Sequence, residues 1–285
     1  MPHSQSSVDV PSLVSSFEVL EFMAAGKSGI VYEIDHQRIL KTYTESNDSE
    51  VERRAYERLG SHPNIARYLG ATKDGSIILE RGQVLRMIYR QPGADQIQLH
   101  RKLRWSRDAA EGLRYMHDKG IVQADVGCHN IILTGNDCVK IIDFEGCSID
   151  GEEASSCYEW FSYGRSTAAV SKQTDIFAYG CAIYEIMTGR PPYHELETHD
   201  DRARLVEQQC QKSQFPDVTN LPLGELMGSC WHGAFNSMSE VIWALEAAII
   251  LSLKATWRET VPCWNRTRHC KTSDIIHSVE SDINS

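Results

Sequence analysis

Two polar loops carry residue types that can handle a metal ion and a proton. The stretch 123–130, QADVGCHN, lies between two short apolar runs and places Asp125 and Asn130 five residues apart. Asp143 directly follows another apolar run in VKIIDFEG (139–146). Carboxylate and amide oxygens bind Mg²⁺, and a carboxylate can accept the proton of an alcohol. Taken alone, each residue is better explained as a turn former or as the cap of a strand.

Lys41 and Glu52 add a pair of a kind that handles phosphate. Lys41 lies in the β-like run RILKTY (38–43), and Glu52 lies in the helical stretch SEVERRAYERLG (49–60). A buried lysine that binds phosphates needs a carboxylate to fix its ammonium group. A lysine in a strand more often faces solvent, and Glu50 is an alternative partner on the same helix. The pair therefore indicates phosphate binding only when it is considered together with the two polar loops.

The segment AAGKSGIVYEID (24–35) holds two glycines between β-like runs. Gly26 and Gly29 lack a Cβ and can bring backbone N–H groups close to a polyanion. The GKS inside this segment is not a P-loop, because Glu21 stands where the first P-loop glycine belongs and a β-like run follows. Without further support, a tight turn is the better interpretation.

Together these residues, in this order, resemble the signature of the protein kinase superfamily, and in particular small, divergent kinase-like proteins of filamentous fungi. The resemblance covers residues 17–246 and includes Asp175, which falls on the family's buried helix aspartate. It implies that Lys41, Asp125 and Asn130 are catalytic, with Asp125 accepting the substrate proton. It implies ATP and Mg²⁺ as cofactors, with Asn130 and Asp143 as metal ligands. The implied nucleotide-binding residues are Ala24, Gly26, Lys27, Ser28, Gly29, Val31, Lys41, Glu52, Leu79 and Glu80.

Several positions depart from the kinase pattern. Gln123 and Ala124 replace the His and Arg of the catalytic loop, Gly127 replaces a phosphate-contacting Lys, and Glu145 replaces the glycine of D-F-G. No A-P-E motif is evident in 156–172, and its usual Arg partner is missing as well. The function we expect is an ATP-dependent protein kinase, with Ser/Thr favoured by base rate. The alternatives are a pseudokinase that acts as a nucleotide-binding scaffold, and a small-molecule kinase of the same fold.

The elements that must position these residues form an α+β, bilobal kinase-like fold. β-like runs and one helix predict a β-rich N-lobe over about 17–82, and long helical patterns predict a mainly helical C-lobe over about 83–246. The stretch 174–189 is apolar on nearly all sides, which indicates a buried helix. We expect a disordered leader over 1–16 and a poorly ordered tail over 247–285.

Composition restricts the remaining function classes. The net charge of −10 does not favour a nucleic-acid binder. No run reaches the ~18 apolar residues of a membrane span, and no secretory signal pattern opens the chain. Nine cysteines occur singly, without zinc-site spacing, which favours free thiols in a reducing compartment. We expect a cytoplasmic protein that is not secreted, with the nucleus as an alternative. The sequence indicates neither the protein substrate nor the oligomeric state.

Overall fold

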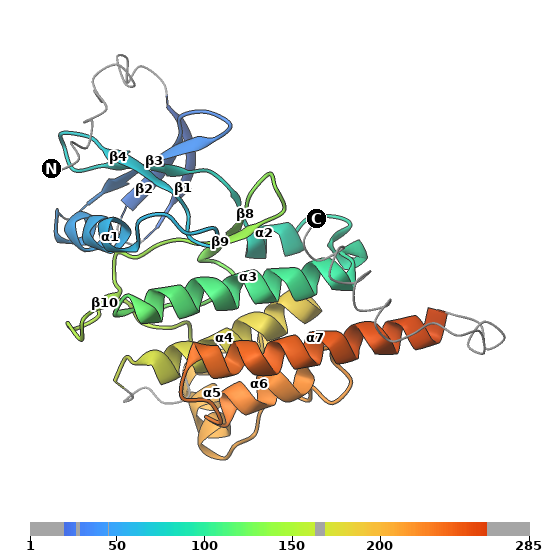
Figure 1. The fold of residues 1–285 in the computed structure, drawn as a ribbon. Helices are drawn as coiled ribbons and strands as arrows, with labels where there is room; N and C mark the ends of the chain where they lie inside the picture. Colours follow the sequence, from blue (N-terminus) through green and yellow to red (C-terminus); the bar gives the residue numbers. More distant parts are fainter. Residues whose placement is uncertain (1–19, 27–28, 45, 163–168, 261–285) are drawn as a thin grey trace, which may run out of the picture.

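The N-lobe is an antiparallel sheet with one helix beside it. The computed structural model describes residues 20–260 except 27–28, 45 and 163–168, and has two lobes (Figure 1). Five strands hydrogen bond in the order β1-β2-β3-β5-β4. Their bounds are β1 Glu21–Ala25, β2 Gly29–Glu33, β3 Arg38–Tyr43, β4 Tyr68–Ala71 and β5 Ile77–Glu80. These strands coincide with the β-like runs of the sequence.

Helix α1 (Ser46–Leu59) presents one buried stripe to the N-lobe core. Glu52, Ala55, Tyr56 and Leu59 are all at most 1 % exposed, and their spacing of three and four residues places them on one helical face. Glu52 is the only charged member of this stripe. A carboxylate buried in this way needs a paired cation, so the position of Glu52 itself points to Lys41.

The C-lobe is helical, with short strands where it meets the N-lobe. The long helices are α3 (Leu99–Asp118), α4 (Lys172–Thr188) and α7 (Met238–Thr260). The shorter helical elements are α2 (Leu85–Tyr89), η2 (Ala94–Gln96), η3 (His194–Leu196), α5 (Arg202–Gln211) and α6 (Gly224–Trp231). The short strands are β6 (Gln83–Val84), β7 (Ile121–Val122), β8 (Ile131–Leu133), β9 (Val139–Ile141) and β10 (Ser148–Ile149). They form a three-stranded sheet, in the order β6-β8-β9, and the pair β10-β7. The loop 123–130 begins after β7 and ends before β8, so these two sheets fix its ends.

Helix α4 is the buried helix that its composition predicts. It begins at a capping box, in which the Ser171 side chain accepts from Thr174 N and the Thr174 side chain accepts from Ser171 N. It ends at Gly189, which has a left-handed φ of 79°, and Pro191 and Pro192 prevent continuation. In Figure 1, α4 lies between α3 above it and α6 below it, and it contacts both.

The last helix extends past the expected end of the kinase-like domain at residue 246. Helix α7 continues to Thr260. Ile249 is 4 % exposed and belongs to the C-lobe core, which explains why the helix extends past Glu246. The leader 1–16 and the remainder of the tail lie outside the described residues. Among the described helices, none is both long and apolar enough to cross a membrane.

Candidate active site

Lys41 lies at the junction of the two lobes, within reach of carboxylates from both. Its Nζ is 2.7 Å from Glu52 Oε2 on α1 and 2.6 Å from Asp143 Oδ1, which follows β9. The Lys41 side chain is 10 % exposed and that of Glu52 is fully buried. Burial alone would lower the pKa of Lys41, but the surrounding carboxylates raise it well above its usual value. Lys41 is therefore a firmly held cation in direct contact with Asp143.

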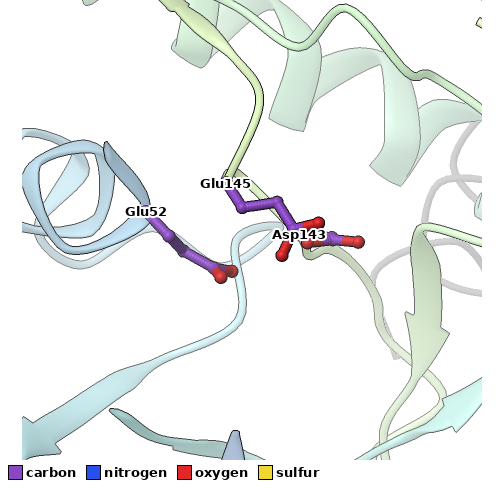
Figure 2. Close-up of side chains that lie close together, drawn as sticks. All are labelled: Glu52, Asp143 and Glu145. Atoms are coloured by element: carbon purple, nitrogen blue, oxygen red, sulfur yellow. The ribbon is translucent and has the colours of Figure 1, made fainter. Parts of the chain in front are cut away.

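Glu145 joins this cluster as a third carboxylate. Its Oε2 is 2.9 Å from Lys41 Nζ. Figure 2 shows the three acids converging, Glu52 from helix α1 and the other two from the segment after β9. Ligand oxygens of Glu52, Asp143 and Glu145 all lie within 4.8 Å of one another. In the sequence Glu145 is evident only as the residue that replaces the D-F-G glycine; its contact with Lys41 is seen only in the structure.

The glycine-containing segment lies beside Lys41 in the N-lobe sheet. Ala24 is the cross-strand partner of Val31, and Val31 is in turn the partner of Lys41, so the three lie in a row across the sheet. Gly26 N donates to Gly29 O at 2.9 Å and closes the turn between β1 and β2. A Cβ on Gly29 would lie 2.0 Å from Thr42 O, so only glycine fits against β3. Lys27 and Ser28 lie outside the described residues.

Asp175, at the start of α4, binds the backbone at the beginning of the loop 123–130. Its carboxylate accepts hydrogen bonds from Gln123 N at 2.9 Å, Ala124 N at 3.1 Å and the Tyr158 hydroxyl at 2.7 Å. His117 Nε2 lies 2.8 Å from it, and Asp175 itself has no exposed surface. Ala124 adopts a left-handed φ of 66°, which costs about 1–3 kcal/mol in a residue other than glycine. The buried carboxylate offsets this strain by fixing the two N–H groups.

Gln123 links the loop 123–130 to the segment that carries Asp143. Its Nε2 donates to Ile142 O at 3.0 Å and to Asp143 O at 2.8 Å. Asp143 is also left-handed, with φ 66°, so this side chain restrains a second strained residue. The sequence presented Gln123 as a lost histidine, whereas the structure gives its amide a definite role. Nothing short of the tertiary contact could have identified it.

Asp125 and Asn130 face one another inside the loop. Asn130 Nδ2 donates to Asp125 O at 2.9 Å and to Asp125 Oδ2 at 3.1 Å. Asp125 Oδ1 is buried and accepts no hydrogen bond from the described residues. Ile142 N donates to Asn130 O at 3.0 Å, which places Asn130 beside the segment that carries Asp143. Asn130 and Asp143 thus offer, from neighbouring segments, the hard oxygen donors that Mg²⁺ prefers.

The predicted adenine contacts lie at the end of β5. Leu79 is buried at 3 % exposure, opposite Ile39 of β3. Glu80 N donates to Arg67 O at 2.9 Å, so that donor is already committed within the N-lobe. The Glu80 carboxylate lies 3.0 Å from Lys140 Nζ. The expectation of a nucleotide-binding backbone at this position therefore depends on groups other than the Glu80 N–H.

Comparison with known families agrees with this geometry. The family model described as protein tyrosine and serine/threonine kinase matches residues 27–240. The chain belongs to this family. The bilobal fold expected from the resemblance is thereby confirmed.

Curated plant kinases are among the similar proteins. Mitogen-activated protein kinase kinase kinase 1 of Arabidopsis thaliana is 32 % identical over 150 residues, which cover 48 % of this chain and 24 % of that protein. Serine/threonine-protein kinases STY17 and CTR1 of the same plant are each 25 % identical, over 182 and 186 residues, covering 60 % of this chain and 31 % and 22 % of the relative. The chain thus spans less than a third of the length of each of these relatives.

Proposed function

We propose that this kinase domain is an ATP-dependent protein kinase that transfers the γ-phosphate to a protein hydroxyl, with serine or threonine favoured. The observation that carries the proposal is Lys41, which contacts Glu52 of the N-lobe and Asp143 of the C-lobe at the same time. A lysine anchored in this way binds nucleotide phosphates only when the helix and the metal-binding loop are both in place. The relatives named serine/threonine-protein kinases support the choice of acceptor.

Each side chain has a defined role in this proposal. Gly26 and Gly29 cover the phosphates, Lys41 binds them and Glu52 orients Lys41. Asn130 and Asp143 hold Mg²⁺, which neutralises phosphate charge when bound. The acceptor oxygen attacks the γ-phosphorus, its proton passes to Asp125, and the bond to the bridging oxygen breaks, with its electron pair leaving on ADP.

Transfer from radiolabelled ATP with Mg²⁺ tests the proposal, with autophosphorylation and casein as acceptors. We expect Lys41→Met and Asp125→Asn each to lower transfer by about 100-fold or more, because they remove the phosphate anchor and the base. EDTA should abolish transfer by the wild type. Asp118→Asn is the matched control, because this carboxylate is 58 % exposed at the end of α3 and should leave the rate unchanged.

Equal labelling by the wild type and Asp125→Asn would contradict the proposal and favour a pseudokinase that acts as a scaffold. Transfer to metabolite hydroxyls without any labelled protein would instead identify a small-molecule kinase.

We also propose a cytoplasmic location. The seven cysteines among the described residues are free, and Cys128, Cys147, Cys181 and Cys230 are buried. Unpaired thiols are usual where glutathione and thioredoxin keep them reduced, which supports this assignment.

A further inference from the structure

The imidazole of His129 fills the space that a side chain at residue 127 would need. A Cβ built on Gly127 would lie 2.6 Å from His129 Nδ1 and 2.7 Å from its Cε1. Atoms in a close-packed interior do not approach so closely, so the ring and a side chain at 127 exclude one another. The kinase pattern has its phosphate-contacting lysine at this position. The lysine is therefore not simply deleted, because another side chain occupies its place.

His129 contacts the proposed base directly. Its Nε2 lies 3.1 Å from Asp125 Oδ2, and its Nδ1 lies 3.0 Å from Glu159 Oε2. Burial alone would lower the pKa of His129, but the two carboxylates raise it to about 9. The ring thus bridges the catalytic loop and the segment that leads into α4.

The far side of this bridge is anchored by a half-buried arginine. Arg86 of α2 donates to both carboxylate oxygens of Glu159, at 2.6 and 2.7 Å, and to both of Glu185 on α4, at 2.6 and 2.7 Å. The Arg86 side chain is 14 % exposed and that of Glu185 is 2 % exposed. Two bidentate contacts define the orientation of the guanidinium group closely. The Glu159 carboxylate is consequently held in one position by Arg86.

The backbone of the loop is tied to the same anchor. Arg86 N donates to Cys128 O at 3.1 Å, one residue before His129. The Cys128 thiol points to Ala182 O on α4, at 3.6 Å. Charges alternate along the connected side chains from α4 to the loop: Glu185, Arg86, Glu159, His129 and Asp125.

We propose that His129 is a positioning residue for Asp125. The ring lies in the space left free at Gly127, is anchored through Glu159 to Arg86, and holds Asp125 Oδ2. These contacts fix the orientation of the Asp125 carboxylate, whose Oδ1 is buried. This inference rests on the proposed function, since Asp125 acts as a base only if the domain transfers phosphate. It explains why Gly127, which looks like a loss in the sequence, is compatible with an intact loop.

Gly127→Ala and His129→Ala test the positioning role without touching Asp125. We expect each to lower kcat for casein phosphorylation about tenfold, with the KM for ATP and the Tm nearly unchanged, because a displaced base slows chemistry and not nucleotide binding. The double variant should be no slower than His129→Ala, since both changes remove the same contact. Gly135→Ala is the control, because no atom lies within 4 Å of its Cβ. Unchanged kcat in Gly127→Ala and His129→Ala, or a loss explained by lowered Tm, would overturn the proposal.

Nitrogen-15 spectra of the histidine rings give a second readout that needs no activity. In the full chain, Asp125→Asn should shift the Nε2 signal of His129 and Glu159→Gln its Nδ1 signal, with His129→Gln assigning both. If the ring signals do not shift in these variants, the contacts of His129 with Asp125 and Glu159 are contradicted. If wild-type transfer equals that of Asp125→Asn while the ring signals respond, the proposed function fails, and with it the catalytic part of this inference, whereas the contact stands.

Discussion

At the scale of single residues, Lys41 contacts three carboxylates, one more than its proposed role in nucleotide binding uses. Glu52 and Asp143 already neutralise it, and Glu145 adds a third carboxylate at 2.9 Å. The Glu145 side chain is 17 % exposed, so solvent screens it only partly. Phosphate oxygens that approach Lys41 must displace this carboxylate or bear its repulsion. We therefore expect Glu145 to weaken the affinity for nucleotide in the absence of metal.

Removing Glu145 tests this conclusion. We expect Glu145→Gly to bind ADP in EDTA about tenfold more tightly than the wild type, which corresponds to ~1.4 kcal/mol. Glu145→Gln, which keeps the length and removes the charge, should recover most of the gain. Isothermal titration calorimetry measures both. Weaker binding by Glu145→Gly in EDTA would show that the carboxylate supports the nucleotide site, contrary to this argument.

At the scale of elements, the contact between α4 and α6 depends on a residue without a side chain. A Cβ on Gly180 would lie 2.8 Å from Cys230 Cβ and 3.0 Å from Trp231 Nε1. Gly180→Ala should lower the free energy of unfolding by about 1–2 kcal/mol, because overpacking outweighs the gain in helix propensity. Gly228→Ala is the matched change on α6, with no atom within 4 Å of its Cβ, and should raise stability by about 0.5–1 kcal/mol. Urea unfolding separates the two, and equal effects would contradict the packing argument.

Elements and site differ in how far the sequence predicts them. Strands and helices follow from periodicity and from stop signals such as Gly189, which are local properties of the chain. Lys41, Glu52 and Asp143 were predicted as one cluster because their types and order match a known pattern. The contacts of His129 and Glu159 were not predicted, because they join residues 30 positions apart through a space that exists only in the folded loop. A fit of this kind between side chains leaves no periodic pattern and no motif in the sequence.

At the scale of the whole molecule, the two lobes meet through a few buried groups. Phe144 N donates to Glu52 Oε1 at 3.2 Å, and the Phe144 ring packs edge-on against Tyr56 of α1 at 4.8 Å between ring centroids. Phe144 and Tyr56 are at most 1 % exposed. The position of α1 and that of the segment after β9 are therefore coupled: a shift of either would expose apolar rings and leave Glu52 without its partners.

Helix α7 allows a test of where the cooperatively folded domain ends. Helix α7 packs along α3, with Ile249 at 4 % exposure and its neighbour Ile250 at 47 %. If the helix past Glu246 is part of the cooperative fold, Ile249→Ala should lower the free energy of unfolding by about 2–4 kcal/mol through lost burial and a residual cavity. Ile250→Ala, the same change one position along, should stay within about 0.5 kcal/mol. Urea denaturation with matched m-values measures both. If Ile249→Ala were as mild as Ile250→Ala, residues after 246 would add nothing to the stability of the domain, and the boundary inferred from sequence would hold energetically although the helix continues.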